Sequence, residues 1–429
     1  MTNRMLIAAR AALAGGIGLL LWHSPGQSSG FALPEVSAAG IGTANALVAN
    51  PEDAGAFAYN AAAMGFHDRS SLAVGALFIG PSFSVDTDRS HDSQGADWIA
   101  APMIQAALKL NENWRIGLGI NAPFGLETRW AFGTFPALSQ PISTRIPGLS
   151  LPAGLDHPTQ SELEVLALVP TATFKVKDNL SLSAGIDYYD ARQATLNTAV
   201  NGLEGDGDGW GWNLGLLYRP GPLSLGASFH SAATLGVEGD VTTTNSVLIG
   251  LGTPSSQGAE VDLDLPWRLQ LGARYEVNDN LALELDWSRT GWSEFDELRI
   301  RSKTTGEILK TDRNAWEDAS AYRLGATYRV SPRTLLRFGY TYDETGQPDQ
   351  YFSARIPDSD RHLFALGVGH DLGQGWAIDA GYLYVRFRER SYRGAKTYVP
   401  RQDVNGTDAV DGDYEAQAHL VGLEVRKTF

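Results

Sequence analysis

The 429-residue chain lacks cysteine altogether, and beyond residue 30 it lacks any long run of apolar residues. Without cysteine, disulfide bonds cannot contribute to its stability. A membrane-spanning helix needs about 18 or more consecutive apolar residues, so the sequence predicts no transmembrane helix. The stability of the chain must therefore come from a large, well hydrogen-bonded scaffold.

Basic residues are also fewer than acidic residues. The chain has 34 Lys and Arg residues against 49 Asp and Glu residues. Two of the basic residues, Arg4 and Arg10, lie in the N-terminal segment described next; without them 32 basic residues remain, and the net charge is near −17. This charge disfavours nucleic acid and anionic membrane surfaces as partners. It is compatible with an anionic ligand held by a few local cations.

The N-terminal 29 residues have the layout of a secretory signal peptide. Arg4 and Arg10 flank a short basic region, residues 11–22 form an apolar core, and small residues follow. We expect cleavage between about Gly26 and Gly30, so that the mature chain begins near the sequence GFALPE. The protein is therefore predicted to be exported from the cytoplasm.

Histidine is scarce, and the chain shows little sign of a catalytic or metal site. None of the 8 His residues forms a close pair typical of a zinc site. Glu204, Asp206 and Asp208 have calcium-like spacing, but the remaining ligands of an EF-hand loop are missing. Ser228 and His230 could belong to a hydrolase, yet no oxyanion hole or orienting carboxylate is evident. We therefore predict no catalytic residue, no metal, no cofactor and no enzyme activity.

From residue 69 onward, strand-like segments with alternating side chains are separated in turn by very short polar turns and by long loops. In 281–288, for example, every second residue is Leu or Trp, and the residues between are polar or small. The short turns fall at 111–113, 177–179, 220–222, 278–280, 331–333 and 373–375. The aromatic residues that flank them are Trp114, Tyr218, Tyr275, Tyr328 and Trp376. Such aromatic residues are typical of the girdle at a membrane interface.

The alternation fits either a soluble β-sandwich or a membrane barrel. The aromatic girdle, the long strands and the grouping of all long loops at one end favour the barrel. Six short turns and seven long loops give fourteen strands, with both termini on the periplasmic side. The loops are expected near 84–102, 124–161, 196–209, 239–260, 293–316, 344–360 and 390–413. The prediction is an all-β protein, a 14-stranded antiparallel transmembrane β-barrel over residues 69–429.

Residues 30–68 precede the first strand, are rich in Ala and Gly, and do not alternate. A barrel of fourteen strands leaves a lumen that its own side chains cannot fill. We therefore expect this segment, which includes Phe31, to form an N-terminal hatch that plugs the lumen. A periplasmic tail is the alternative.

Two outer loops are unusually apolar for a protein that would form an open pore. Such exposed apolar surface often marks a binding site, and the alternative is that these residues pack on one another and close the barrel. The candidate residues for hydrophobic capture are Phe132, Phe135, Leu138, Ile146, Leu248, Ile249 and Leu251. A ligand that binds them would be hydrophobic.

The strand in 115–125 is interrupted near its outer end by Pro123 and Gly125. Proline cannot donate to a sheet ladder, and glycine permits a sharp bend. A gap in the wall would allow a hydrophobic ligand to leave sideways into the bilayer, provided that the hatch covers the unpaired backbone. The alternative is that Pro123 simply ends the strand.

Three segments of the chain resemble the FadL long-chain fatty acid transporter family of outer membrane proteins, which includes importers of toluene and xylene-like hydrocarbons. They are GFALPEVSAAGIGTANA at the start of the mature chain, residues 265–300, and residues 322–370 with IPDSDR at 356–361. The resemblance implies a fourteen-stranded barrel with a hatch, ligand capture on outer loops, and a kink in the third strand that opens to the bilayer. The residues at the expected lateral opening are Asn121, Pro123, Phe124 and Gly125.

The chain departs from this family at two places. The family's hatch carries an Asn-Pro-Ala motif near the kink, whereas the matching positions here are Asn60, Ala61 and Ala62. In the fatty-acid branch, an arginine late in the fifth strand and a lysine entering the tenth hold the carboxylate. Arg192 matches that arginine, although strand parity places it on the outer face. The lysine position falls near 317–319 and holds no cation.

Arg323 lies close to the missing lysine and faces the lumen by parity, so it is our second candidate partner for a carboxylate. We predict passive import of hydrophobic compounds, with long-chain fatty acids as the ligand, across the outer membrane of a Gram-negative-type cell. The alternatives are an importer of neutral aromatic hydrocarbons and a general porin. The expected partners are the hydrophobic small molecule and outer membrane lipid, and the barrel is expected to be a monomer.

Overall fold

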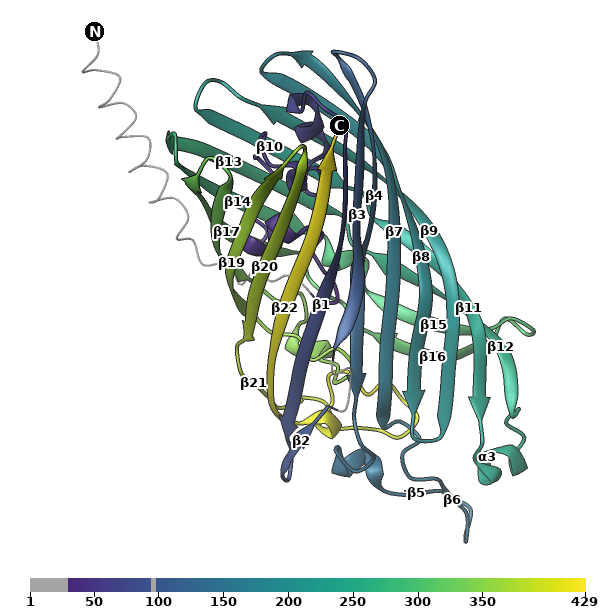
Figure 1. Ribbon diagram of the computed structural model, residues 1–429. Helices are drawn as coiled ribbons and strands as arrows, with labels where there is room; N and C mark the ends of the chain where they lie inside the picture. The colour runs from purple at the N-terminus through teal and green to yellow at the C-terminus, as the bar shows by residue number, and fades with distance from the viewer. Residues whose placement is uncertain (1–29, 94–97) are drawn as a thin grey trace.

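The computed structural model describes residues 30–93 and 98–429, and the predicted signal peptide lies outside these residues. Twenty of the strands form one closed antiparallel sheet, and several spans consist of two strands in succession. The sheet is therefore a fourteen-stranded barrel, as predicted (Figure 1).

The strands of the barrel are β1 (Ser71–Asp86), β2 (Ser90–Asp92), β3 (Ile99–Lys109), β4 (Trp114–Arg129), β7 (Pro158–Lys177), β8 (Leu180–Thr198), β9 (Asn201–Tyr218), β10 (Leu223–His230), β11 (Ala233–Thr243), β12 (Ser256–Leu265), β13 (Arg268–Asn278), β14 (Leu281–Thr290), β15 (Glu297–Ser302), β16 (Ile308–Arg313), β17 (Ala319–Ser331), β18 (Thr334–Asp343), β19 (Arg361–Gly373), β20 (Trp376–Phe387), β21 (Arg390–Tyr392) and β22 (Gly412–Thr428). The outer loops contain a small ribbon of β5 (Ile142–Ser143) and β6 (Ser150–Leu151), the helix α3 (Ser246–Gly250) and the 3-10 turns η3 (Pro136–Ser139), η4 (Trp292–Glu294), η5 (Asp349–Tyr351) and η6 (Asp408–Val410).

The first and last strands close the barrel. β1 and β22 form an unbroken antiparallel ladder from the pair Ser71 and Thr428 to the pair Asp86 and Asp413. Closure removes the free sheet edges at this seam, so that the backbone polar groups are satisfied by neighbouring strands.

Side chains alternate so that apolar groups face outward and polar groups face the lumen. In β14, Leu283 and Leu285 are 40% and 63% exposed, whereas Glu284 and Asp286 between them are 1% and 5% exposed. A soluble sandwich would bury the leucines instead. The outer surface is therefore suited to hydrocarbon, which is the surface expected of a membrane barrel.

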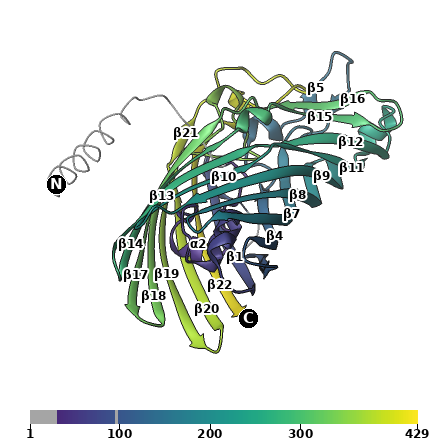
Figure 2. The ribbon, with the colours of Figure 1, turned by 90° about the horizontal axis from the view of Figure 1, so that it is seen from above.

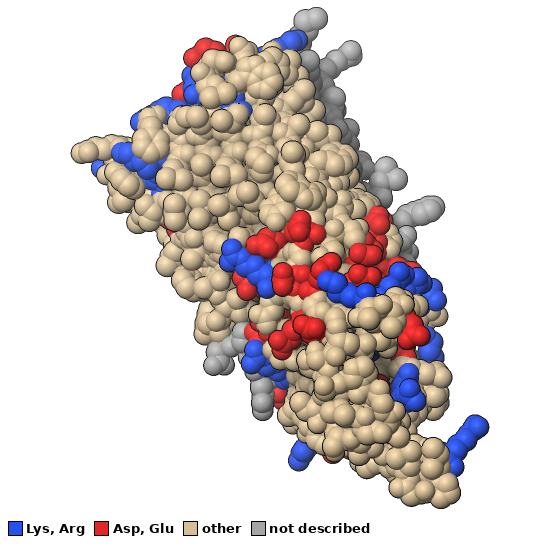
Figure 3. Space-filling view, turned by 90° about the vertical axis from the view of Figure 1, so that its right-hand side faces the viewer, with Lys and Arg blue, Asp and Glu red and all other residues tan. Residues whose placement is uncertain are grey.

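A band of charged residues marks where this apolar wall ends toward the long loops (Figure 3). On β9 the outward side chains change from Trp210 and Trp212, both exposed, to Asp206 and Asp208. Charged side chains belong in the headgroup region or beyond it, and exposed Trp residues are typical of the interface. The acidic segment predicted as a loop at 196–209 is thus mostly strand, because the hairpin β8–β9 turns only at residues 199–200.

Residues 30–68 lie inside the barrel (Figure 2). They form the short helix α2 (Ala38–Gly42) and two 3-10 turns, η1 (Ala54–Ala58) and η2 (Ala61–Phe66). Small residues allow the hatch to approach the wall closely: a Cβ added to Gly42 would lie 2.9 Å from the Cα of Gly367 on β19. The predicted hatch is therefore confirmed as part of the fold. None of the helices in the described part of the chain is long and apolar enough to cross a membrane.

Barrel carboxylates hold the centre of the hatch. The backbone N–H groups of Leu47 and Val48 donate to the Asp286 carboxylate at 3.0 and 3.2 Å, and that of Ala49 donates to Glu284 at 2.7 Å. This part of the hatch has no sheet or long helix in which its backbone N–H groups could pair. The barrel carboxylates supply the hydrogen-bond acceptors that these groups need.

A buried ionic network holds the next part of the hatch. Arg337 on β18 bonds Asp53 of the hatch at 2.7 Å and Asp379 on β20 at 2.8 Å. All three side chains are almost completely buried, so each charge depends on the others for compensation.

Candidate functional site

The wall of the barrel is interrupted between β3 and β4. Their ladder runs only from the pair Lys109 and Arg115 to the pair Ile104 and Ile120, which leaves residues 99–103 of β3 without partners in β4. The pairing of β4 with β7 shifts register between Asn121 and Phe124. The strand nevertheless continues to Arg129, so Pro123 does not end it.

The hatch supplies the hydrogen bonds that the interrupted strand lacks. The N–H of Leu33 donates to the Pro123 carbonyl at 2.8 Å, and the N–H of Gly125 donates to the Phe31 carbonyl at 2.9 Å. The register shift turns Phe124 inward, where it is 1% exposed. The hatch residues thus cover the unpaired backbone from the lumen side, which lowers the cost of the gap.

A cavity of about 230 Å³ lies beside this gap, and we call it the wall cavity. Its apolar lining comes from the hatch, from β1, β3, β4 and β7, and from β19, β20 and β22. The residues with apolar side chains that define it best are Leu33, Pro81, Pro102, Phe124, Leu126 and Leu163. Its charged lining residues are five acidic ones and one cation: Glu35, Glu127, Glu162, Glu164, Asp358 and Arg361.

A second cavity, of about 80 Å³, lies toward the outer loops, and we call it the loop-side cavity. Leu126 and Leu163 line both it and the wall cavity, so the two adjoin. The rest of its lining is largely aliphatic and aromatic, including Leu196, Leu263 and Phe295. An apolar region with a few polar groups is typical of a site for a hydrophobic ligand.

Phe31 occupies the centre of an aromatic cluster at the end of the hatch. Its ring lies 4.8 Å from Trp292, 5.3 Å from Phe295, 5.9 Å from Phe124 and 6.2 Å from Trp316, centroid to centroid. Edge and tilted contacts of this kind add to the gain from burial. The cluster joins the hatch, the kinked strand and the loop after β14 into one packed unit. Sequence reasoning missed the two tryptophans because nothing in 292–316 relates them to residue 31.

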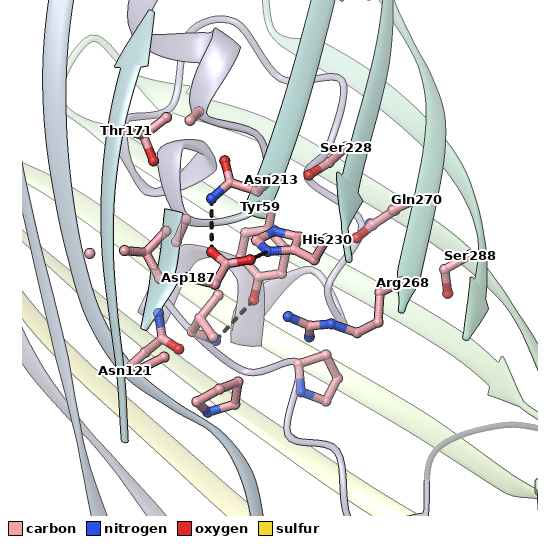
Figure 4. A pocket seen from close by; sticks show the side chains of 18 of the residues that line it. Tyr59, Asn121, Thr171, Asp187, Asn213, Ser228, His230, Arg268, Gln270 and Ser288 are labelled. Carbon is pink, nitrogen blue, oxygen red and sulfur yellow. Dashed lines mark hydrogen bonds and ion pairs between the residues drawn. The ribbon is translucent and has the colours of Figure 1, made fainter. Parts of the chain in front are cut away.

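A third cavity, of about 100 Å³, lies in the lumen between the hatch and strands β7 to β17, and we call it the lumen cavity (Figure 4). It is the most polar of the three at its centre. The Asp187 carboxylate bonds His230 at 2.8 Å and accepts from Asn213 at 2.8 Å. Arg323 and Arg268 also line it, as do Pro123 and Asn121 from the kinked strand.

The two predicted carboxylate partners lie in different places. Arg323 is in the lumen cavity, 8% exposed, and its Nη1 donates to Ser288 Oγ at 2.7 Å. Arg192 is the extra residue of a bulge in β8, and its side chain is 54% exposed beside Asp190. The structure therefore does not bring the two arginines together, and only Arg323 borders a cavity.

The predicted hatch motif makes well-defined contacts without its proline. The Asn60 side chain caps η2 by accepting from the Ala62 N–H at 3.1 Å, and it donates to the carbonyls of Val48 and Leu216. The Ala61 carbonyl accepts from Thr173 on β7 at 2.9 Å. Asn60 thus links two parts of the hatch to β9, and Ala61 borders the lumen cavity.

The predicted capture residues divide into buried and exposed groups. Phe135, Leu138 and Leu248 are buried, whereas Phe132, Ile146, Ile249 and Leu251 are 41% to 61% exposed. The buried residues of the first loop pack with Trp130, Phe352 and other loop residues into a cluster at the mouth of the barrel. Some of these side chains therefore pack together at the mouth of the barrel, and others are exposed there; capture of a ligand by the exposed ones stays a prediction.

Burial changes the ionisation of two carboxyls in the outer-loop segment. Asp358, within IPDSDR, accepts from the Gly30 N–H at 3.2 Å and from Thr345 Oγ1 at 2.5 Å. Burial raises its pKa to about 6. Burial, together with Asp360 and Asp343, raises the pKa of Glu344 to about 7. The end of the hatch is thus tied to a carboxyl that titrates in a mildly acidic range.

Within residues 30–93 and 98–429, no group of three or more metal-ligating side chains could hold a metal ion. Glu204, Asp206 and Asp208 lie on the outer face of β9, pointing away from the lumen. Ser228 lines the lumen cavity with His230, and the structure adds Asp187 beside that histidine.

A family model described as outer membrane protein transport protein (OMPP1/FadL/TodX) matches residues 20–429. The long-chain fatty acid transport protein of Escherichia coli O6:H1 is 26% identical, with all of this chain and all of that protein covered. Among solved structures, a Pseudomonas aeruginosa FadL homologue has a TM-score of 0.77 at 20% identity, covering 94% of this chain and 100% of that one. The Ralstonia pickettii toluene transporter TbuX has a TM-score of 0.68 at 17% identity, covering 92% and 98%. The chain therefore belongs to the OMPP1/FadL/TodX family of outer membrane transport proteins, and it is a transporter of hydrophobic compounds in the outer membrane and not an enzyme.

Proposed function

We propose that this protein imports long-chain fatty acids passively, through a lateral exit in the barrel wall. The observation that carries the proposal is the adjoining pair of apolar cavities, one toward the outer loops and one at the unpaired segment of β3. A hydrophobic ligand gains free energy by staying in apolar surroundings, and a route that ends in the bilayer keeps it there.

The route has three steps. The exposed side chains of Phe132, Ile146 and Ile249 capture the ligand at the outer loops. The ligand then enters the loop-side cavity, where Phe31 and Phe295 form part of the lining. Displacement of the Phe31 segment from β4 breaks two hydrogen bonds and opens the wall cavity between β3 and β4. The partners are thus the ligand and the surrounding lipid, and one barrel is sufficient for the whole route.

The test blocks the gap while leaving the barrel intact. A side chain added at Gly125 would start 3.0 Å from the Leu33 side chain, so Gly125→Trp fills the opening. Gly236 on the outer wall has no atom within 4 Å of an added Cβ, and Gly236→Trp is the matched control. We expect Gly125→Trp to abolish uptake of a labelled long-chain acid into cells, with normal heat-modifiable gel mobility of the folded barrel. Full uptake by Gly125→Trp would contradict the lateral route.

A second variant tests the hatch. Proline suits the first position of a helical turn, and Ala61 occupies that position in η2 after the Asn60 cap. Ala61→Pro restores the residue that the family motif contains and stiffens this part of the hatch. We expect a changed uptake rate with an unchanged barrel.

Neutral aromatic hydrocarbons are a second candidate ligand class. The excess of five acidic residues over the single Arg361 around the wall cavity, and the missing cation at 317–319, favour a ligand without negative charge. Equilibrium binding of a long-chain acid and of toluene to the purified barrel separates the two classes. Preference for toluene would assign the protein to hydrocarbon import, and measurable conductance of small ions would instead indicate a porin.

A further inference from the structure

We infer that Arg268 holds the anionic head group of the transported ligand in the lumen cavity; this rests on the proposed function and names the charge class of its ligand. Arg268 is the first residue of β13 and lies half-buried with its guanidinium in the lumen cavity. Figure 4 shows its side chain pointing toward the centre of the cavity, beside His230 and Asp187.

Arg268 is attracted through space by the Asp187 carboxylate but has, within the described part of the chain, no hydrogen-bonded partner for its charge. Among the described residues, none forms a hydrogen bond or an ion pair with its guanidinium, and the contact that it does make is with the face of the Phe124 ring, 5.7 Å from the centroid. A guanidinium has five N–H donors and a permanent charge, and leaving it unpaired in a low-dielectric lumen is costly. The side chain is therefore placed to receive an anion from outside the protein.

The other charged groups of the cavity are already engaged. His230 bonds Asp187, and Asn213 donates to the same carboxylate, so that Asp187 has two hydrogen-bonded partners and offsets the charge of Arg268 only through space. Arg323 donates to Ser288 and lies on the far side of β14 from Arg268 in strand order. Arg268 is thus the better candidate for a carboxylate, ahead of both Arg323 and the exposed Arg192.

The surroundings of Arg268 fit an amphiphile. Asn121, Ser228 and Gln270 supply neutral polar groups in the same cavity, and Val36, Phe57 and Val169 supply apolar wall. The wall cavity next to it is lined by five acidic residues and one arginine, Arg361, and this excess of negative charge disfavours an anion. A long-chain acid would therefore rest with its head on Arg268 and its tail across Phe124 toward the apolar cavities.

The position of Arg268 also couples the head group to the exit. Its guanidinium lies over Phe124, the residue that the kink turns inward. An anion that pairs with the guanidinium competes for this cation–π contact. Occupation of the site would thus loosen the contact that Phe124 makes inside the lumen.

The experiment compares a long-chain acid with the alcohol of the same chain length, by equilibrium binding to the purified full-length barrel. The first variant, Arg268→Met, keeps an apolar side chain of similar length but removes the charge. The second, Arg268→Lys, keeps the positive charge but removes the planar guanidinium that can bind a carboxylate through two hydrogen bonds. Arg323→Met and Arg192→Met are matched controls that remove the other two cations.

We expect Arg268→Met to weaken binding of the acid by about 10- to 100-fold and to leave binding of the alcohol within about twofold. The reason is that only the acid has a carboxylate that forms a charge-assisted hydrogen bond with the guanidinium. Arg268→Lys should retain part of the preference for the acid. A merely structural role for Arg268 would weaken both ligands equally.

Two outcomes would overturn the inference. Unchanged acid binding in Arg268→Met, or a selective loss of acid binding in Arg323→Met alone, would remove Arg268 from the head-group site and leave the proposed import intact. Binding of neither ligand by the unaltered barrel would instead remove the proposed function on which the inference rests.

Discussion

The two ends of the hatch are held in the lumen by different kinds of interaction. Residues 47–53 are held by buried carboxylates and by the Arg337 network, from strands β14, β18 and β20. Residues 31–33 are held by two backbone hydrogen bonds to β4 and by the aromatic cluster around Phe31. Charged networks buried in this way are lost as a unit, whereas apolar contacts and two hydrogen bonds can be broken locally. The N-terminal end of the hatch can therefore move without release of the whole hatch.

The largest effect should come from the strongly held end. Arg337→Met leaves the carboxylates of Asp53 and Asp379 buried without their main partner, at a cost of about 3–5 kcal/mol. We expect the hatch of this variant to become sensitive to protease and the barrel to conduct ions in planar bilayers. Arg219→Met removes partly exposed ion pairs to Glu276 and to Glu52 of the hatch, and it is the control: exposed pairs contribute little, so this variant should stay closed. A closed, protease-resistant Arg337→Met variant would show that the network does not hold the hatch.

A smaller and local effect is expected at the other end. Phe31→Ala empties the centre of the aromatic cluster and should destabilise the N-terminal end of the hatch by about 3 kcal/mol. The measurement is hydrogen exchange at the Gly125 amide, which donates to the Phe31 carbonyl. Exchange at Gly125 should become faster, while the Ala49 amide, which donates to Glu284, should stay protected. Phe57→Ala removes a ring from a different hatch cluster and should leave the Gly125 amide unchanged. Equal acceleration at Gly125 and Ala49 would mean that the hatch moves as one body.

The same end of the hatch should respond to pH through Asp358, which accepts from Gly30. Its pKa in the folded protein, about 6, lies above the ordinary 3.8, so the folded state binds the proton more tightly than the unfolded state. Its contribution is therefore fully present below about pH 4 and is lost as the pH rises through about 6, on the order of 3 kcal/mol. The protection of the amides in residues 30–33, after correction for the intrinsic pH dependence of amide exchange, should fall over this interval. Asp358→Asn cannot titrate, and a pH dependence that persists in this variant would assign the effect to another group, such as Glu344.

The smallest effect is expected at the exposed capture residues. Ile146→Ser removes a side chain that is 61% exposed, and it should change stability by less than about 0.5 kcal/mol while slowing capture of ligand at low concentration. Phe135→Ala, in the same loop but completely buried, should instead loosen the cluster that closes the barrel mouth. Melting and ligand on-rates of the two variants would separate capture from closure. Identical behaviour of both variants would mean that the loop has a single role.

The barrel could be predicted from the sequence because its signals are local. Alternation with period two and the short turns depend on neighbours in the chain, and 281–288 shows both the strand and the face of each side chain. The acidic segment in 204–208 was assigned to a loop for an equally local reason, since its Gly and Asp residues are typical of turns. In the structure an added Cβ at Gly207 would lie 2.1 Å from the Gly236 carbonyl oxygen, so these glycines allow close strand pairing.

The interior could be predicted only in part, because it depends on distances across the lumen. Parity placed Arg323 inside and Arg192 outside, and the structure agrees with both. Parity could not show that Asp286 would bind the hatch backbone, or that Trp292 and Trp316 would meet Phe31. Arg268 alternates with Gln270 and Arg274 along β13, which places it toward the lumen, but only the surrounding side chains show that its guanidinium lacks a hydrogen-bonded partner among the described residues.

The position of α2 has a consequence for the order in which the protein assembles. This helix begins only about forty residues into the chain, yet it packs against β19, β20 and β22, which are made last. β22 is also the strand that joins β1 and completes the ring. The contacts of α2 are therefore complete only when these last strands are in place, so that seating of the hatch and closure of the ring depend on the same strands. Contacts so distant in the chain make folding slow, and the rate at which the last hairpin docks should limit how fast mature protein accumulates in the membrane.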